Sequence, residues 1–405
     1  MRLLLPLLLL PLLLLPLLLI GTTANLSAQE TPGQKLAEYD PSGLIRFASE
    51  KEAEARREKL IRYLWPDGLP VTALPKREAV AAEIFENDLK GIDSEPARSV
   101  ERLSIDVAPF EFHATCYLLQ PKAVNTNSRR LVIIHSGHRR PGPIGEGVND
   151  SANALLRAGF QVAMVDMPLI GWNQHNTAKI PSGEVVSFGP RHDDMFRVLT
   201  PHLADGTVFR LFVEPVVQTI NSFYAVTKVA QDVTMIGLSG GGWATHFCAA
   251  IDPRIRTSFP VAGAMPLYAR KLSPGSWGDS EQFYEPLYGE ADGDGDGITD
   301  KAVGVASWLE IFALGAIGSN RRQVQVLNYS DPCCFSTDVY SSYDQFLQKK
   351  VDEIGAGSWS VYSDRSHKKH IISLAVIDGV ILPALAQGES NASGRNMRRL
   401  ILVNR

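Results

Sequence analysis

Short apolar runs alternate with helix-like segments along most of this chain. The strand-like runs lie at residues 131–134, 160–165, 233–236, 257–261, 323–327 and 358–362, and further strand-like stretches cover 107–119. Most of these runs lack the in–out alternation of a strand with one wet face, which indicates strands buried on both faces. We therefore expect an α/β fold: a mostly parallel central sheet with helices on both faces and antiparallel strands at its start.

Helix-like patterning fills the gaps between these runs. The predicted helices cover 149–158, 208–230, 242–250 and, closing the fold, 371–385. Residues 29–97 are charged and helix-prone. We expect this order along the chain: a signal peptide at 1–28, a helical segment at 29–97 that packs on the main domain, an α/β domain at 98–388 with insertions at 167–207 and 267–305, and a tail at 389–405.

The first residues have the pattern of an export signal. Arg2 precedes an almost pure leucine stretch that ends at Ile20, and small or polar residues follow up to Ala28. Cleavage after Ala28 or Ala24 would suit a signal peptidase. A membrane anchor is the alternative, because the stretch is about long enough to span a bilayer. Its prolines and weak positive flank favour cleavage, which predicts a secreted or periplasmic protein with no stable membrane span.

Composition and cysteine usage narrow the classes of function. Of 405 residues 45% are hydrophobic, and the formal net charge of -4 offers no general attraction to nucleic acid. We therefore expect no nucleic-acid partner. Cys116 and Cys248 sit in apolar patterns typical of small buried residues, whereas adjacent Cys333 and Cys334 could close a vicinal ring or bond to other partners.

The strongest chemical signal follows the run at 233–236. Residues 237–241 read Gly-Leu-Ser-Gly-Gly, a G-x-S-x-G pattern between a predicted strand and a predicted helix. A sharp turn there lifts the Ser239 hydroxyl out of the sheet and needs neighbours without bulky Cβ atoms. The Gly240 amide, at a helix N-terminus, could then point at a developing oxyanion. The pattern alone is common in turns, and its context favours a nucleophile.

A serine nucleophile needs a base and an orienting acid. Asp331 is the first acid beyond the strand at 323–327, and His370 lies between the strand at 358–362 and the closing helix. The order nucleophile, acid, histidine fits a Ser-Asp-His triad. His367 remains an alternative base, and Asp338 or Asp364 could serve as the acid.

An oxyanion hole requires a second amide from an earlier turn. The run at 131–134 ends in His135-Ser136-Gly137-His138, which places this turn suitably. The donor could be the amide of Gly137 or that of His138, and the sequence does not decide between them.

Together these features resemble the α/β-hydrolase superfamily over roughly residues 98–386. Besides the 237–241 turn, the resemblance rests on His135-Ser136-Gly137, Asp166-Met167-Pro168 and the segment 249–255, which is similar to that in carbohydrate esterases and dienelactone hydrolases. It implies Ser239 as nucleophile, Asp331 as acid and His370 as base. We expect a carboxylic ester hydrolase that forms an acyl-enzyme on a small-molecule or carbohydrate-linked ester. The alternatives are a serine peptidase and a non-catalytic binding protein of the same fold.

Two insertions remain to be interpreted. The first follows the strand that ends at Asp166 and is expected to act as a lid or pocket wall; its His192-Asp193-Asp194 lacks the spacing of a metal site. The second contains Asp292, Asp294, Asp296 and Asp300 with interspersed glycines, which could bind a structural calcium ion or form an acidic flexible loop. Catalysis itself should require no cofactor.

Overall fold

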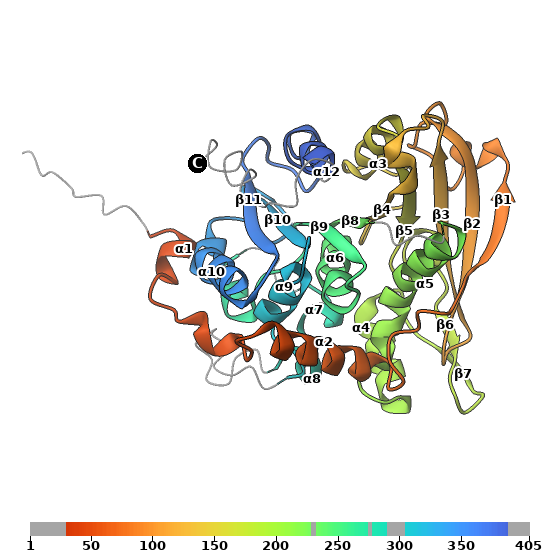
Figure 1. Ribbon diagram of the computed structural model, residues 1–405. Coiled ribbons are helices and arrows are strands. Elements are labelled where there is room, and N and C mark those ends of the chain that lie inside the picture. The colour runs from red at the N-terminus through yellow and green to blue at the C-terminus, as the bar shows by residue number, and fades with distance from the viewer. Residues whose placement is uncertain (1–29, 228–231, 274–277, 290–303, 388–405) are drawn as a thin grey trace, which may run out of the picture. The chain divides into compact units, whose positions relative to one another are not determined.

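The computed structural model describes residues 30–227, 232–273, 278–289 and 304–387 (Figure 1). The predicted signal peptide, the C-terminal tail and the predicted calcium ligands Asp292, Asp294, Asp296 and Asp300 lie outside the described residues. A nine-stranded sheet has the order β1-β2-β3-β5-β4-β8-β9-β10-β11. Its strands are β1 (Lys76–Val80), β2 (Ala97–Val107), β3 (Phe112–Pro121), β4 (Leu131–His135), β5 (Gln161–Val165), β8 (Val233–Leu238), β9 (Ile255–Val261), β10 (Arg322–Asn328) and β11 (Ser358–Asp364).

The sheet is antiparallel at its start and parallel over the rest. β2 pairs antiparallel with β1 and β3, and β3 pairs antiparallel with β5. From β5 through β4, β8, β9 and β10 to β11 every pairing is parallel. The expected mixed, mostly parallel sheet is confirmed. Because the carboxyl ends of parallel strands meet at one edge, the loops after β4, β8, β10 and β11 share that edge.

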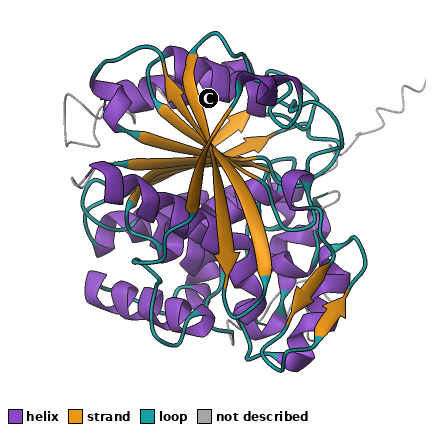
Figure 2. Cartoon of the chain, turned by 90° about the vertical axis from the view of Figure 1, so that its right-hand side faces the viewer, coloured by secondary structure: helices purple, strands orange, loops and turns teal. Residues whose placement is uncertain are grey.

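Helices cover both faces of the twisted sheet (Figures 1 and 2). In β4, Leu131 and Ile133 face one apolar core, while Val132 and Ile134 face the other. The first core lies under α2, α5, α6, α9 and α10. The second lies under α3 and the C-terminal helical segment formed by α11, a π-helical turn and α12. The α-helices are α1 (Pro32–Lys35), α2 (Glu50–Leu64), α3 (Val148–Arg157), α4 (His192–Leu199), α5 (Arg210–Thr227), α6 (Gly240–Ile251), α7 (Ser280–Phe283), α8 (Glu285–Tyr288), α9 (Trp308–Ala316), α10 (Asp344–Ile354), α11 (Leu374–Val376) and α12 (Leu382–Gln387), with a π-helical turn at Ile377–Ile381.

The N-terminal segment is joined to the main domain by a buried arginine. Arg57 of α2 is buried and donates hydrogen bonds to the carbonyl oxygens of Ala250 in α6 and Leu314 in α9. A cation at a helix C-terminus satisfies carbonyls that have no partner within the helix. The segment 29–97 is not helical throughout, however, because it also supplies β1, which pairs with β2 at the edge of the sheet.

The insertion after β5 carries its own small elements. It contains a two-stranded hairpin, β6 (Thr177–Lys179) and β7 (Val185–Ser187), followed by α4. Its action as a lid stays a prediction. None of the helices in the described part of the chain has the length and apolarity needed to span a bilayer.

Candidate active site

The nucleophile turn has the strained backbone that its sequence predicts. Ser239 has φ 59° and ψ -124°, a conformation that costs a residue with a Cβ of order 1–3 kcal/mol. Helix α6 begins directly after it, at Gly240, two residues earlier than expected. A Cβ on Gly241 would collide with the carbonyl oxygen of His135, so glycine is required where α6 approaches the end of β4. Ser239 therefore sits, partly exposed, on a sharp turn at a helix N-terminus.

His370 and Asp331 lie together at the same edge of the sheet. Nδ1 of His370 is 2.7 Å from Oδ2 of Asp331, whose carboxylate is fully buried. Asp331 follows β10 and His370 follows β11, so the fold joins residues 39 positions apart. The carboxylate fixes the proton on Nδ1 and leaves the lone pair on Nε2. No hydrogen-bond partner for this buried Nε2 occurs among the described residues.

The Asp331 carboxylate is held by its own loop. Its Oδ1 accepts the amide hydrogens of Cys333, at 2.8 Å, and of Cys334, at 3.2 Å. Asn328, buried at the end of β10, donates to Oδ2 at 3.2 Å and to the carbonyl oxygen of Ile371 at 3.0 Å. Asn328 thus links the acid to the loop that carries the histidine. The sequence analysis did not identify it, although its position between strand and acid was a usable signal.

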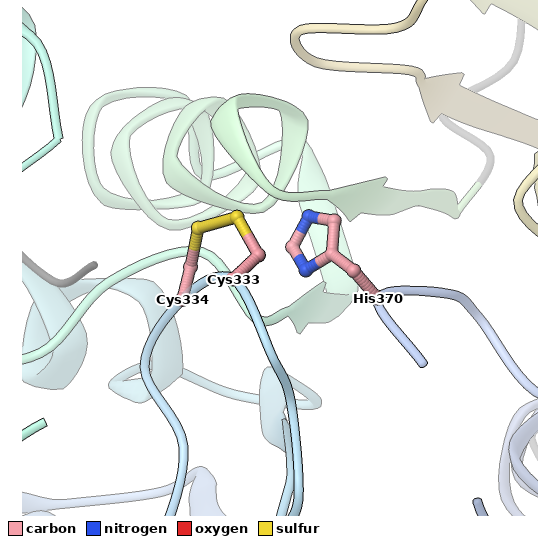
Figure 3. Close-up of side chains that lie close together, drawn as sticks. All are labelled: Cys333, Cys334 and His370. Atoms are coloured by element: carbon pink, nitrogen blue, oxygen red, sulfur yellow. A yellow bond between two sulfur atoms is a disulfide. The ribbon is translucent and has the colours of Figure 1, made fainter. Parts of the chain in front are cut away.

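Cys333 and Cys334 form a disulfide with each other beside His370 (Figure 3). Of the two arrangements left open for this pair, the vicinal ring is the one found. Cys116 and Cys248 are free and buried, as their apolar surroundings indicate. The two sulfur atoms and a ring nitrogen of His370 lie within 4.8 Å of one another. Since both sulfurs are oxidised, they are not thiolate ligands for a metal.

The alternative residues form a second pair. Nε2 of His367 is 3.1 Å from Oδ2 of Asp364, and its Nδ1 accepts the amide hydrogen of Lys369 at 3.0 Å. Asp364 also accepts a hydrogen bond from the hydroxyl of Ser373, at 2.5 Å, the residue that caps α11. Both ring nitrogens of His367 are therefore engaged. The third candidate acid, Asp338, accepts the amide hydrogen of Gly33 at 2.9 Å.

The turn after β4 is fixed by a buried carboxylate. Arg139 contacts Asp166 with Nε at 3.0 Å and Nη2 at 2.9 Å, and the hydroxyl of Ser136 also donates to Asp166. Burial raises the pKa of Asp166, and the Arg139 guanidinium offsets part of that rise. Within the turn, the Gly137 amide donates to Nδ1 of His135 at 3.3 Å.

A second group of polar side chains lies next to this turn. Sequence reasoning expected no metal site at His192, since it saw no partners at suitable spacing. The partners come instead from distant segments, on the turn after β4 and around α7. We call the group the His–carboxylate cluster; its members are His138, His192, Asp279 and Glu281.

Comparison with known proteins identifies the fold. Acetyl xylan esterase 1 from a Thermoanaerobacterium species matches with a TM-score of 0.51 at 18% identity, over 89% of this chain and 98% of the other. An acetyl xylan esterase from a Paenibacillus species matches with a TM-score of 0.50 at 13% identity, over 85% and 97%. The chain has the α/β-hydrolase fold. It also spans 66% of the length of a methylesterase that matches with a TM-score of 0.49. No protein-family model and no curated protein matches the sequence.

The α/β-hydrolase fold accounts for where each predicted residue lies. In this fold the nucleophile turn follows a central strand, while the acid and the histidine follow later strands of the same sheet. Ser239 follows β8, Asp331 follows β10 and His370 follows β11, as that arrangement requires. At these identities the likeness concerns the fold alone, so the chemistry has to be argued from the side chains.

Proposed function

We propose that the protein is a serine hydrolase that cleaves carboxylic esters through an acyl-enzyme on Ser239. One observation carries the proposal: the His370–Asp331 pair leaves a buried Nε2 without a hydrogen-bond partner among the described residues, at the sheet edge where Ser239 occupies a strained turn. A base oriented by a buried carboxylate and left with one free nitrogen is suited to accept a proton from a hydroxyl.

The proposed reaction proceeds in two halves. Nε2 of His370 accepts the hydroxyl proton of Ser239 while Oγ attacks the ester carbonyl, and Asp331 stabilises the resulting imidazolium. The tetrahedral intermediate collapses, and the departing alcohol takes the proton from His370. Water then attacks the acyl-enzyme, again giving its proton to His370, and Ser239 recovers its own proton as the carboxylic acid leaves.

Two backbone amides are proposed to stabilise the oxyanion. The first is Gly240, the first residue of α6, whose amide lies at the positive end of the helix. For the second, both Gly137 and His138 were candidates. Because the Gly137 amide already donates to His135, we favour the amide of His138. Loss of one such donor typically costs about 3 kcal/mol of transition-state stabilisation.

The substrate class is proposed from the fold and the comparisons. Two of the similar structures are acetyl xylan esterases, which supports a short acyl group on a carbohydrate or another small alcohol. Export, predicted from the leader, suits a polymeric or extracellular substrate. A structural calcium ion at Asp292–Asp300 stays a sequence-based proposal.

The decisive experiment combines covalent labelling with turnover. A fluorophosphonate probe should label the wild-type chain and fail to label Ser239→Ala, because only an activated serine attacks the phosphorus. Turnover of p-nitrophenyl acetate should fall to background in the same variant. Labelling that survives Ser239→Ala would refute the nucleophile, and faster cleavage of peptide anilides than of acyl esters would identify a peptidase instead.

A further inference from the structure

The His–carboxylate cluster has the spacing of a metal site. His138 Nε2 lies 3.0 Å from His192 Nδ1 and 3.1 Å from Asp279 Oδ2, while His192 Nδ1 lies 3.2 Å from a Glu281 oxygen. His192 Nδ1 lies 3.7 Å from Asp279 Oδ2 and His138 Nε2 lies 3.8 Å from Glu281 Oε1, and one ligand atom from each of the four residues lies within 4.8 Å of all the others. A tetrahedral zinc ion with bonds of about 2.0–2.1 Å holds neighbouring ligand atoms about 3.3 Å apart. The observed distances bracket that value.

A backbone carbonyl orients His192 toward the cluster. Its Nε2 lies 2.9 Å from the carbonyl oxygen of Pro168, and this contact directs Nδ1 at the other side chains of the cluster. Metal-bound histidines commonly donate their other N–H to a backbone carbonyl in this way.

Glu281 supplies an independent observation. Its side chain is fully buried, and neither carboxylate oxygen has a hydrogen-bond partner of good geometry among the described residues. A buried carboxylate costs several kcal/mol unless it is well paired. The contacts of Glu281 with His192, at 3.2 Å, and with His138, at 3.8 Å, lack hydrogen-bond geometry, and a cation among these atoms would satisfy the carboxylate.

From these observations we propose that the His–carboxylate cluster binds one divalent transition-metal ion, with zinc as the best fit. Two imidazoles with two carboxylates suit zinc, whereas calcium and magnesium prefer sites made wholly of oxygen. His192 and Glu281 are buried, but the side chains of His138 and Asp279 are 34% and 35% exposed, which gives the ion a path from solvent.

The ion would connect three segments beside the nucleophile. His138 belongs to the turn after β4, His192 is the first residue of α4, and Glu281 lies in α7. A Cβ on Gly240 would lie only 2.7 Å from Nδ1 of His138, so the imidazole packs directly on the nucleophile turn. The ion would thereby fix the insertion helices and the proposed oxyanion turn relative to one another.

The test is a metal-binding measurement on the full chain without a polyhistidine tag. After removal of metals, the protein is kept in non-reducing buffer with excess Ca²⁺, so that the vicinal disulfide and any calcium loop do not compete. We expect one equivalent of Zn²⁺ by mass spectrometry, a higher Tm on zinc addition, and a Kd for Zn²⁺ weaker on the order of 100-fold in Glu281→Gln.

A matched control and a second readout keep the test decisive. Asp193 neighbours His192 and accepts hydrogen bonds from Ser280, but it is outside the cluster, so Asp193→Asn should keep the wild-type zinc affinity. Titration of the wild-type chain with Co²⁺ should give the visible absorption of a four-coordinate ion, removed by one equivalent of Zn²⁺. No such band, or equal affinity in Glu281→Gln, would overturn the proposal. Fluorophosphonate labelling of the metal-free chain tests the serine hydrolase separately.

Discussion

Two histidine–aspartate pairs lie at the ends of β10 and β11, and they differ in how each imidazole is held. His370 contacts Asp331 through Nδ1, and its Nε2 has no hydrogen-bond partner in the described ranges of the chain, whereas His367 contacts Asp364 through Nε2 and accepts the Lys369 amide hydrogen at Nδ1. Proximity of imidazole and carboxylate is therefore common to both pairs. Of the two pairs, only the one around His370 retains a ring nitrogen that can accept a proton from a nucleophilic hydroxyl.

The hydrogen bonds to the two carboxylates support the same distinction between the pairs. Asp331 is oriented by the amides of Cys333 and Cys334, which leave Oδ2 directed at His370. Asp364 instead receives the hydroxyl of Ser373, the N-cap of α11. One carboxylate orients a base and the other holds a helix terminus, so substitutions should separate activity from stability.

Replacing each of the two histidines by alanine in turn should give the largest contrast in kcat. His370→Ala should lower kcat with p-nitrophenyl acetate on the order of 10⁵-fold, because the hydroxyl of Ser239 loses its base. His367→Ala should change kcat less than about threefold, since no ring nitrogen is available for proton transfer. Circular dichroism would establish that both variants are folded. A larger loss in His367→Ala would reverse the assignment of the base.

Replacing each of the two carboxylates should give a somewhat smaller contrast in kcat than replacing the histidines. Asp331→Asn should lower kcat about 10⁴-fold, because an amide can stabilise neither the required tautomer nor the imidazolium. Asp364→Asn should cost less than about tenfold and act mainly on Tm. Steady-state kinetics and thermal melts of the two variants, made in parallel, provide the measurement. Equal kinetic losses would show that the pairs are coupled.

The sequence predicted the geometry that depends on neighbouring residues and missed the arrangements that depend on folding. Ser239 could be predicted because its constraint lies in five consecutive residues between a strand and a helix. Asp331 and His370 could be narrowed down because the carboxyl ends of parallel strands share an edge. The choice of His370 over His367 depends on ring orientation, which no spacing encodes.

Glu281 shows the limit of sequence reasoning more sharply. Its partners in the proposed metal site, His138 and His192, come from segments 143 and 89 residues away, and no periodicity relates them. The helix boundary at Gly240 was misplaced for a similar reason. Glycines are weak helix formers, and only the packing of α6 against the ends of β4 and β9 makes them helical here.

Loss of the disulfide should have an intermediate effect on kcat, and this effect should be confined to the His370–Asp331 pair. Its two cysteine amides hold Asp331, so replacing both cysteines by serine should loosen that carboxylate and lower kcat about tenfold. In the part of the chain that the structure describes, the side chains of His367 and Asp364 form no hydrogen bond with residues 331–334, so this pair should keep its arrangement. Activity of the wild-type enzyme before and after reduction with dithiothreitol provides the check. An unchanged kcat in both comparisons would mean that the backbone holds the turn without the bond.

The smallest expected effect is a pH dependence of stability that belongs to Asp364. Burial acts to raise the pKa of Asp364, but hydrogen bonds from Ser373 and Ser366 and the nearby His367 outweigh it and lower the pKa below the usual 3.8. A carboxyl group with a lowered pKa stabilises the fold above its unfolded pKa and loses that contribution as the pH falls through the folded value. The wild type should therefore melt about 2 °C above Asp364→Asn at pH 7, and this Tm difference should shrink below about pH 4. A Tm difference that stays constant from pH 7 to pH 3 would mean that the charge of Asp364 contributes nothing to stability. The structural role that separates Asp364 from Asp331 would then rest on its hydrogen bond to Ser373, the N-cap of α11.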